Sequence, residues 1–356
     1  MKRREFIAGS AGLLSGAALT FPTNAAQVAT IRGIKGPFRV IDVHDHTLNT
    51  AAPNLTEEAR NYQPPDGTIE ALIRGMDAAG VDHGFLLTYS AEDLGAEIRA
   101  RKADPIDLKP VVNRAYQINA WNAHKDRFWL YVNYSNALRE TFPEDLERDL
   151  EQGAVGWKYM PVFYGFLADN HGFLPGYEVC RRHRASVIID LCYWLIGPYE
   201  PYHPKSPNAL PAGEAVPAYP LYNETPYRQK AVTTFEDYAR LLDPVFSAFP
   251  TVPVLLAHLG TPRDEKDFEA VLSLVKRHPN VFLDTSAHKV PVARYREIIE
   301  TVGARKLMWG TDWIGSSIDT SLSSWRTIQD QCDFLSESEK ALVLHENALR
   351  FVQGEV

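Results

Sequence analysis

The stretch FRVIDVHDH at residues 38–46 joins an apolar run to two histidines that stand two positions apart. Its Val and Ile residues favour a buried β-strand. Side chains two positions apart on a strand point to the same face, so His44 and His46 are expected side by side. Two imidazoles placed in this way can share one divalent metal ion. The stretch therefore predicts a first buried strand and a candidate metal site at its end.

Seven further runs of this kind follow, and stretches with helical periodicity separate them. The runs cover residues 81–89, 128–135, 155–160, 186–192, 252–258, 280–286 and 306–312. The helical stretches cover residues 68–79, 112–125, 143–152, 176–184, 234–249, 265–277 and 291–302, and a closing one covers about 336–351. Such alternation is typical of a parallel sheet covered by helices. Eight units predict a single-domain (β/α)8 TIM barrel over residues 38–352.

A doubly wound sheet with a second domain is the other fold that 356 residues allow. It would carry a GxGxxG turn after its first strand, and no such turn follows residue 46. The strand count therefore favours the barrel.

In a TIM barrel the chemistry lies at the carboxyl ends of the strands. The sixth run ends at His258 and the eighth at Asp312. Taken alone, His258 would be a core histidine and Asp312 a turn or cap residue. Together with His44 and His46 they predict a metal site, because such groups are costly to bury without a shared ion or mutual hydrogen bonds.

Five motifs stand in the order seen in the amidohydrolase superfamily: DVHDH at 42–46, GAVGWK at 153–158, AHLG at 257–260, LDTS at 283–286 and GTD at 310–312. The chain resembles the amidohydrolase-related branch, which includes decarboxylases of the aminocarboxymuconate-semialdehyde type and metal-dependent hydrolases. The resemblance covers residues 39–351.

This resemblance implies one bound divalent metal, commonly zinc, held by His44, His46 and Asp312. It implies two catalytic residues, Asp312 as proton acceptor and His258 as acid or base. The family usually adds a histidine from strand five, where this chain has Asp190, and we expect Asp190 to serve as a further metal ligand in its place. An aspartate can ligate Zn²⁺ and would shift preference modestly toward Mn²⁺ or Fe²⁺. Loss of that ligand would instead leave a barrel that binds a small molecule without turning it over.

Three further polar residues near the strand ends are left out of the predicted site. Some relatives carry a carboxylated lysine at the position of Lys158, but a lysine without metal contact, or one in a surface salt bridge, is favoured. Asp284 is expected to bond to backbone, and His288 lies in a loop.

These residues suggest a hydrolase that activates water to cleave a small organic ester, lactone or amide. A non-oxidative decarboxylase of an aromatic or unsaturated acid would use the same ligands and is the alternative. A barrel that only binds its ligand is the third possibility.

The first 26 residues have the parts of an export signal: Lys2, Arg3 and Arg4, an uncharged stretch at 8–20, and small residues at 25 and 26. The paired arginines resemble a twin-arginine signal, which predicts the twin-arginine export machinery as a partner and a periplasmic or extracellular location. The uncharged stretch is shorter than the roughly 20 residues that cross a bilayer, so no stable membrane anchor is expected.

Residues 193–228 hold eight of the 24 prolines together with Trp194 and six tyrosines. So long a connection is predicted to be either a lid over the substrate or a contact between subunits of a homo-oligomer. The composition, 45% hydrophobic with a formal charge of −8, indicates a globular protein and argues against a nucleic-acid partner. Three cysteines without a CxxC pair argue against a thiolate zinc site.

Overall fold

The computed structural model describes residues 39–53, 55, 66–88, 111, 113–134, 141–161, 171–191, 235–262, 264–286, 289–314 and 322–356. The predicted export signal and the 193–228 insertion lie outside these residues, as does His288. Within the described ranges, none of the helices has the length and apolar character needed to span a bilayer.

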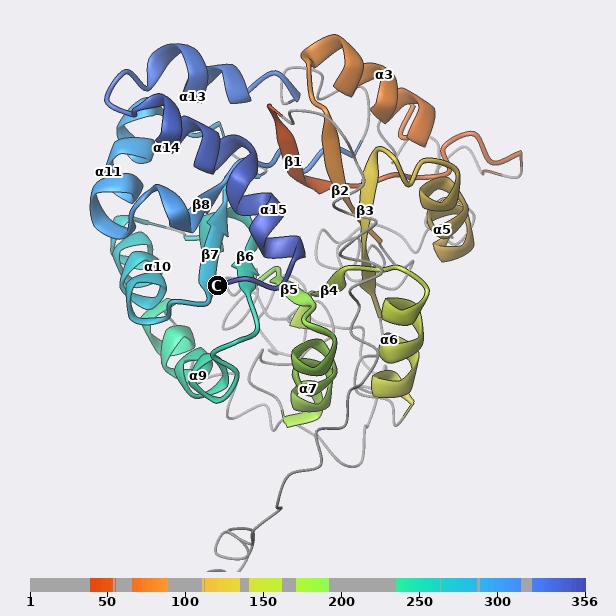
Figure 1. The fold of residues 1–356 in the computed structure, drawn as a ribbon, viewed down its shortest axis with the longest axis horizontal. Coiled ribbons are helices and arrows are strands. Elements are labelled where there is room, and N and C mark those ends of the chain that lie inside the picture. Colours follow the sequence, from red (N-terminus) through yellow and green to blue (C-terminus); the bar gives the residue numbers. More distant parts are fainter. Residues whose placement is uncertain are drawn as a thin grey trace, which may run out of the picture. The chain divides into compact units, whose positions relative to one another are not determined.

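Eight parallel strands form a nearly closed barrel in chain order, with helices around its outside (Figure 1). The strands are β1 (Ile41–Asp45), β2 (His83–Leu87), β3 (Phe128–Asn133), β4 (Gly156–Tyr159), β5 (Ser186–Ile189), β6 (Val254–Leu256), β7 (Val281–Asp284) and β8 (Leu307–Met308). Each overlaps one predicted run. The predicted (β/α)8 TIM barrel is therefore confirmed.

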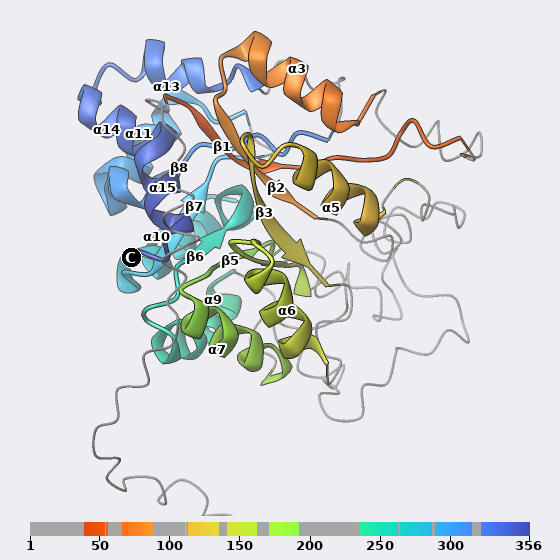
Figure 2. The same cartoon turned by 45° about the vertical axis from the view of Figure 1, so that its right-hand side comes forward.

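The helices follow the predicted stretches closely. They are α3 (Ile69–Ala79), α5 (Arg114–Ala123), α6 (Phe142–Glu151), α7 (Leu174–His183), α9 (Phe235–Ala248), α10 (Glu265–Arg277) and α11 (Val292–Val302), with α13 (Trp325–Gln331), α14 (Glu337–Ala341) and α15 (Asn347–Val352) at the end. Figure 2 shows α3 and α5 outside the β1–β3 side of the barrel. Helix α13 was not predicted.

Alternation along each strand divides the core into two layers. On β4, Trp157 and Tyr159 pack toward the helices, so Gly156 and Lys158 face the barrel interior. A Cβ at Gly156 would lie 2.3 Å from the ring of Tyr131. Glycine at this position therefore makes room for the tyrosine ring inside the barrel.

The ring of strands is closed by bonds between β1 and the segment after β8. The His44 carbonyl accepts from Asp312 N at 2.8 Å, and His46 N donates to the Trp313 carbonyl at 2.8 Å. The Asp42 carboxylate accepts from the backbone and hydroxyl of Thr311 at 2.9 and 2.6 Å. These bonds place Asp312 next to the two histidines that come about 270 residues earlier in the chain.

The C-terminal segment packs against β8 and bonds to the residue that follows it. The predicted closing helix is interrupted by a π-helical turn at Leu342–Glu346, where the Val343 carbonyl accepts from Trp309 N at 3.0 Å. Helix α15 then brings Phe351 against interior rings, with centroids 6.4 Å from Phe85, 6.3 Å from Tyr131 and 5.7 Å from Phe282. Phe351 thus helps to fill the barrel interior.

Candidate metal and catalytic site

The predicted site residues lie at or just beyond the carboxyl ends of four strands. His44 is in β1 and His46 follows it, Asp190 follows β5, His258 lies in the turn Ala257–Gly260 after β6, and Asp312 lies beyond β8. The last two have left-handed backbone, with φ of 57° at His258 and 62° at Asp312. This conformation is costly for residues other than glycine and is concentrated at functional sites.

Both ligand candidates on β1 use one ring nitrogen to bond to the protein. His46 Nδ1 lies 2.9 Å from the Leu87 carbonyl, which can only accept, so Nδ1 carries the proton. His44 Nδ1 lies 3.1 Å from an oxygen of Asp284, with the same consequence. Burial, followed by the charge of Lys158, lowers the pKa of His46 to about 4 and that of His44 well below its ordinary value. Both rings are therefore neutral, with the lone pair on Nε2.

Asp312 faces these two lone pairs. Its Oδ1 lies 3.3 Å from His46 Nε2 and 3.5 Å from His44 Nε2. Burial would raise the pKa of Asp312, but the positive charge of the protonated His258 lowers it below its usual range. Its side chain is 23% exposed, whereas both imidazoles are fully buried. The carboxylate therefore stays ionised and can be approached from outside the barrel.

These three groups fit a divalent metal. One ligand atom from each of His44, His46 and Asp312 lies within 4.8 Å of the others. Asp312 Oδ1 is buried and has no aligned hydrogen bond to any described residue. Two imidazole lone pairs and one carboxylate oxygen are a donor set that Zn²⁺ accepts. The bonds at both Nδ1 atoms fix the ring orientations, as is usual for metal-binding histidines.

Lys158 belongs to this cluster, although it was left out of the predicted site. Its side chain is fully buried, and Nζ lies 3.0 Å from His44 Nε2 and 3.4 Å from His46 Nε2. The surface salt bridge considered above is therefore wrong for this lysine. Its interior position on β4 was the available signal, because a buried lysine needs electron-pair donors around its ammonium group.

Asp190 contacts His258. Its Oδ2 lies 3.4 Å from His258 Nε2, and both residues are buried. Burial alone would lower the pKa of His258, but Asp190 above all, with Asp312 and Asp284, raises it to about 9. The ring of His258 also lies 4.7 Å from that of His44. Asp190 thus contacts His258 and is not one of the three residues, His44, His46 and Asp312, whose ligand atoms lie close together. Its role as a metal ligand stays a prediction.

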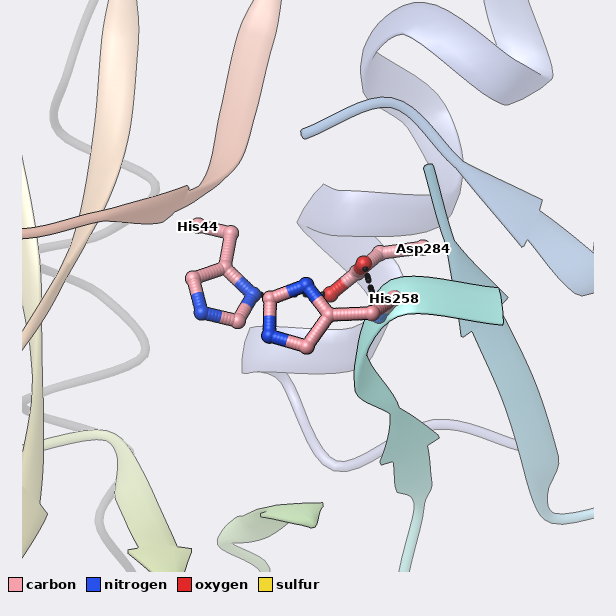
Figure 3. A group of neighbouring side chains, drawn as sticks. All are labelled: His44, His258 and Asp284. Carbon is pink, nitrogen blue, oxygen red and sulfur yellow. Dashed lines mark hydrogen bonds and ion pairs between the residues drawn. The ribbon is translucent and has the colours of Figure 1, made fainter. Parts of the chain in front are cut away.

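Asp284 bonds to backbone, as expected, and also to a ring. Its Oδ1 accepts from His258 N at 2.8 Å and from Ser286 N at 3.0 Å, while its other oxygen accepts from His44 Nδ1. Figure 3 shows the side chains of His44, His258 and Asp284 gathered together, with the backbone bond as a dashed line. The sequence did not indicate this contact with His44.

Comparison with protein families decides the identity of the chain. The family model described as amidohydrolase matches residues 41–353. The protein belongs to the amidohydrolase family. A comparison of this amidohydrolase with curated proteins found no match.

Solved structures share the fold at low sequence identity. A probable 2-pyrone-4,6-dicarboxylic acid hydrolase from Acinetobacter baumannii, with citric acid bound, is 18% identical over 88% of this chain and 99% of its own, with a TM-score of 0.56. The 5-carboxyvanillate decarboxylase from Sphingomonas paucimobilis is 17% identical over 89% of this chain and 99% of its own, with a TM-score of 0.54. A dihydroxybenzoic acid decarboxylase from a Polaromonas species, with manganese and 2-nitroresorcinol bound, is 14% identical over 88% of this chain and 96% of its own, with a TM-score of 0.55. At these identities the likeness establishes the fold.

Proposed function

We propose that this amidohydrolase is a metal-dependent hydrolase of a small organic ester, lactone or amide. One observation carries the proposal: His44 Nε2, His46 Nε2 and Asp312 Oδ1 converge while both Nδ1 atoms are bonded elsewhere. These residues would hold the ion, with Zn²⁺ as the first choice and Mn²⁺ or Fe²⁺ as alternatives. When bound, such an ion supplies an acidified water and a polarised carbonyl.

The surrounding residues provide a base and an acid. The Asp312 carboxylate, kept ionised and partly exposed, accepts the proton of the attacking water. His258, held in its protonated form beside Asp190, donates a hydrogen bond to the oxygen that gains charge in the transition state. Groups whose pKa values are driven apart in one site are suited to these two roles.

Decarboxylation of an aromatic or unsaturated acid is the second candidate. The protonated His258 favours it, because the carbon that loses carbon dioxide must take up a proton. Two of the solved structures with this fold carry the names of decarboxylases. Both reactions would use the same residues, so the products have to separate them.

The test is turnover of esters, lactones, amides and aromatic carboxylates in ¹⁸O-labelled water, with mass spectrometry of products and headspace gas. Hydrolysis places one ¹⁸O atom in the acid product. Carbon dioxide release without ¹⁸O in the product would replace the proposal with decarboxylation. Purified protein with less than about a tenth of a metal ion per chain and no turnover would support a barrel that only binds its ligand.

The Asp312→Asn variant tests the role of Asp312 as proton acceptor. It is expected to lose about 100-fold or more in rate, because the amide cannot accept the proton. Asp243→Asn removes a carboxylate that pairs with Arg277 on the outside of the barrel and serves as the control. Equal rates for the two variants would remove Asp312 from the mechanism.

A further inference from the structure

Ser286 lies two residues beyond the end of β7 and contacts all three residues that Figure 3 draws, His44, His258 and Asp284. Its Oγ is 2.8 Å from His258 Nδ1 and 3.0 Å from His44 Nδ1, and it also bonds to Asp284 Oδ1. All four residues are buried. One hydroxyl group therefore touches the predicted metal-binding histidine, the predicted catalytic histidine and the carboxylate behind them.

The number of protons at this point fixes the direction of each bond. Ser286 has one hydroxyl proton, and an ionised Asp284 can only accept, so the hydroxyl donates to Asp284 Oδ1. The Oγ atom then offers only lone pairs to the two rings. His258 Nδ1 must carry a proton in order to bond to it.

The same reasoning applies to His44. Its Nδ1 faces Ser286 Oγ and an oxygen of Asp284, and both are acceptors. Its Nδ1 therefore also carries a proton, and its Nε2 lone pair is left to face Asp312 and Lys158. The His44 proton thus has two acceptors, and Ser286 Oγ also accepts from His258 Nδ1.

We propose that Ser286 is a positioning residue that, together with Asp284, holds both His44 and His258 in the form protonated at Nδ1. Metal-binding and catalytic roles for these histidines rest on the proposed function, but the proton positions do not. Because one hydroxyl group bonds to both rings, it couples the orientation of His44, in the metal site, to that of His258, which donates to the substrate.

The test is nuclear magnetic resonance of the full chain with ¹⁵N-labelled histidine, because protonated and unprotonated ring nitrogens have well-separated shifts. His44→Gln and His258→Gln assign the signals. Wild-type protein is expected to show protonated Nδ1 in both rings. An unprotonated Nδ1 in either ring would overturn the proposal, whether or not a substrate is ever found.

Two variants then separate Ser286 from its neighbour. Ser286→Ala is expected to shift the His258 ring signals. His44 should keep its Nδ1 proton in this variant, because Nδ1 still donates to Asp284. Thr285→Val, which removes a hydroxyl bonded to the backbone of Gly310, is the control and is expected to leave both rings unchanged. Identical His258 signals in the two variants would contradict the role of Ser286.

A conservative variant and kinetics complete the test. Ser286→Thr keeps the hydroxyl group and is expected to show the wild-type ring signals. This variant keeps the proposal testable if Ser286→Ala does not fold. With a substrate identified, Ser286→Ala should lower kcat about 10- to 100-fold, with a smaller change in KM. A change in KM alone would indicate substrate contact in place of positioning.

Discussion

His44 and His46 each bond to the protein through Nδ1 and turn Nε2 toward Asp312. Such a pair gives a metal-binding site its orientation before any ion arrives, because the rings cannot rotate without losing a buried bond. Lys158 Nζ lies against the same two Nε2 atoms. The two imidazoles thus direct their lone pairs at one positive group, the ammonium group of Lys158.

Replacing either histidine should remove the metal and leave the fold. His44→Ala and His46→Ala are expected to lower bound metal at least about 10-fold, since each removes a ligand at the carboxyl face of the barrel. Elemental analysis with circular dichroism measures both effects. His124→Ala, at the end of α5, is the control and should keep full metal content. Intact metal content in the His44→Ala/His46→Ala double variant would exclude the site.

Lys158→Met should destabilise the protein after treatment with a chelator. The two lone pairs would then face the Asp312 carboxylate without the ammonium group, which we expect to cost about 1–3 kcal/mol. A divalent metal should raise the Tm of this variant more than that of the wild type, because bound metal supplies the missing positive charge. Thermal unfolding with and without Zn²⁺ measures both. Equal Tm values for the two chelated proteins would show that the ammonium group does not stabilise the cluster.

At the scale of elements, helix ends and strand ends use left-handed backbone for different purposes. Helix α3 is followed by Gly80 with φ 79°, and α7 is followed by Arg184 with φ 54°. The turn after β6 has the same conformation at His258, Leu259 and Thr261. At the helix ends this conformation only terminates the helix, whereas in the turn it sets the direction of the His258 side chain. Asp284 stabilises the turn by accepting a hydrogen bond from His258 N.

The two helix ends give a matched pair of stability predictions. Arg184→Gly should raise the free energy of unfolding by about 0.5–1 kcal/mol, because Arg184 is exposed and glycine removes the cost of its positive φ. Gly80→Ala should lower it by about 1 kcal/mol, since an added Cβ meets nothing nearer than 3.8 Å and only the backbone cost remains. Urea denaturation measures both. Changes of the same sign would contradict the argument.

At the scale of the whole molecule, the C-terminal segment completes the barrel. The π-helical turn supplies a carbonyl to Trp309, and Phe351 joins the interior rings of Phe85, Tyr131 and Phe282. Together with the bonds between β1 and the segment after β8, this links the last part of the chain to the first strand. The site depends on that closure, because Asp312 is held by the His44 carbonyl.

Phe351→Ala should lower the free energy of unfolding by about 3–5 kcal/mol, the usual cost of removing a buried aromatic ring. Leu349→Ala, on the same helix at a partly exposed position, is the control and should cost less. Denaturant midpoints followed by circular dichroism measure both. A smaller loss for Phe351→Ala than for Leu349→Ala would show that the ring does not contribute to the core.

Local sequence patterns were enough to predict the eight strands and most of the helices, and they named His44, His46, His258 and Asp312 as candidates for the site. Local periodicity fixes which segments become strands, and barrel topology places their carboxyl ends at one face. The motif pattern adds the family. None of these signals depends on how far one strand is shifted against the next.

Which polar atoms meet depends on the three-dimensional arrangement of the strand ends. Lys158 reaches the two imidazoles from β4, Asp190 contacts His258, and Ser286 joins His258 to His44. Each of these contacts joins residues at the ends of different strands, and the contacts of Lys158 reach from β4 to β1. Their partners are set by strand register and by the left-handed turn at His258, and neither can be read from a local run of residues.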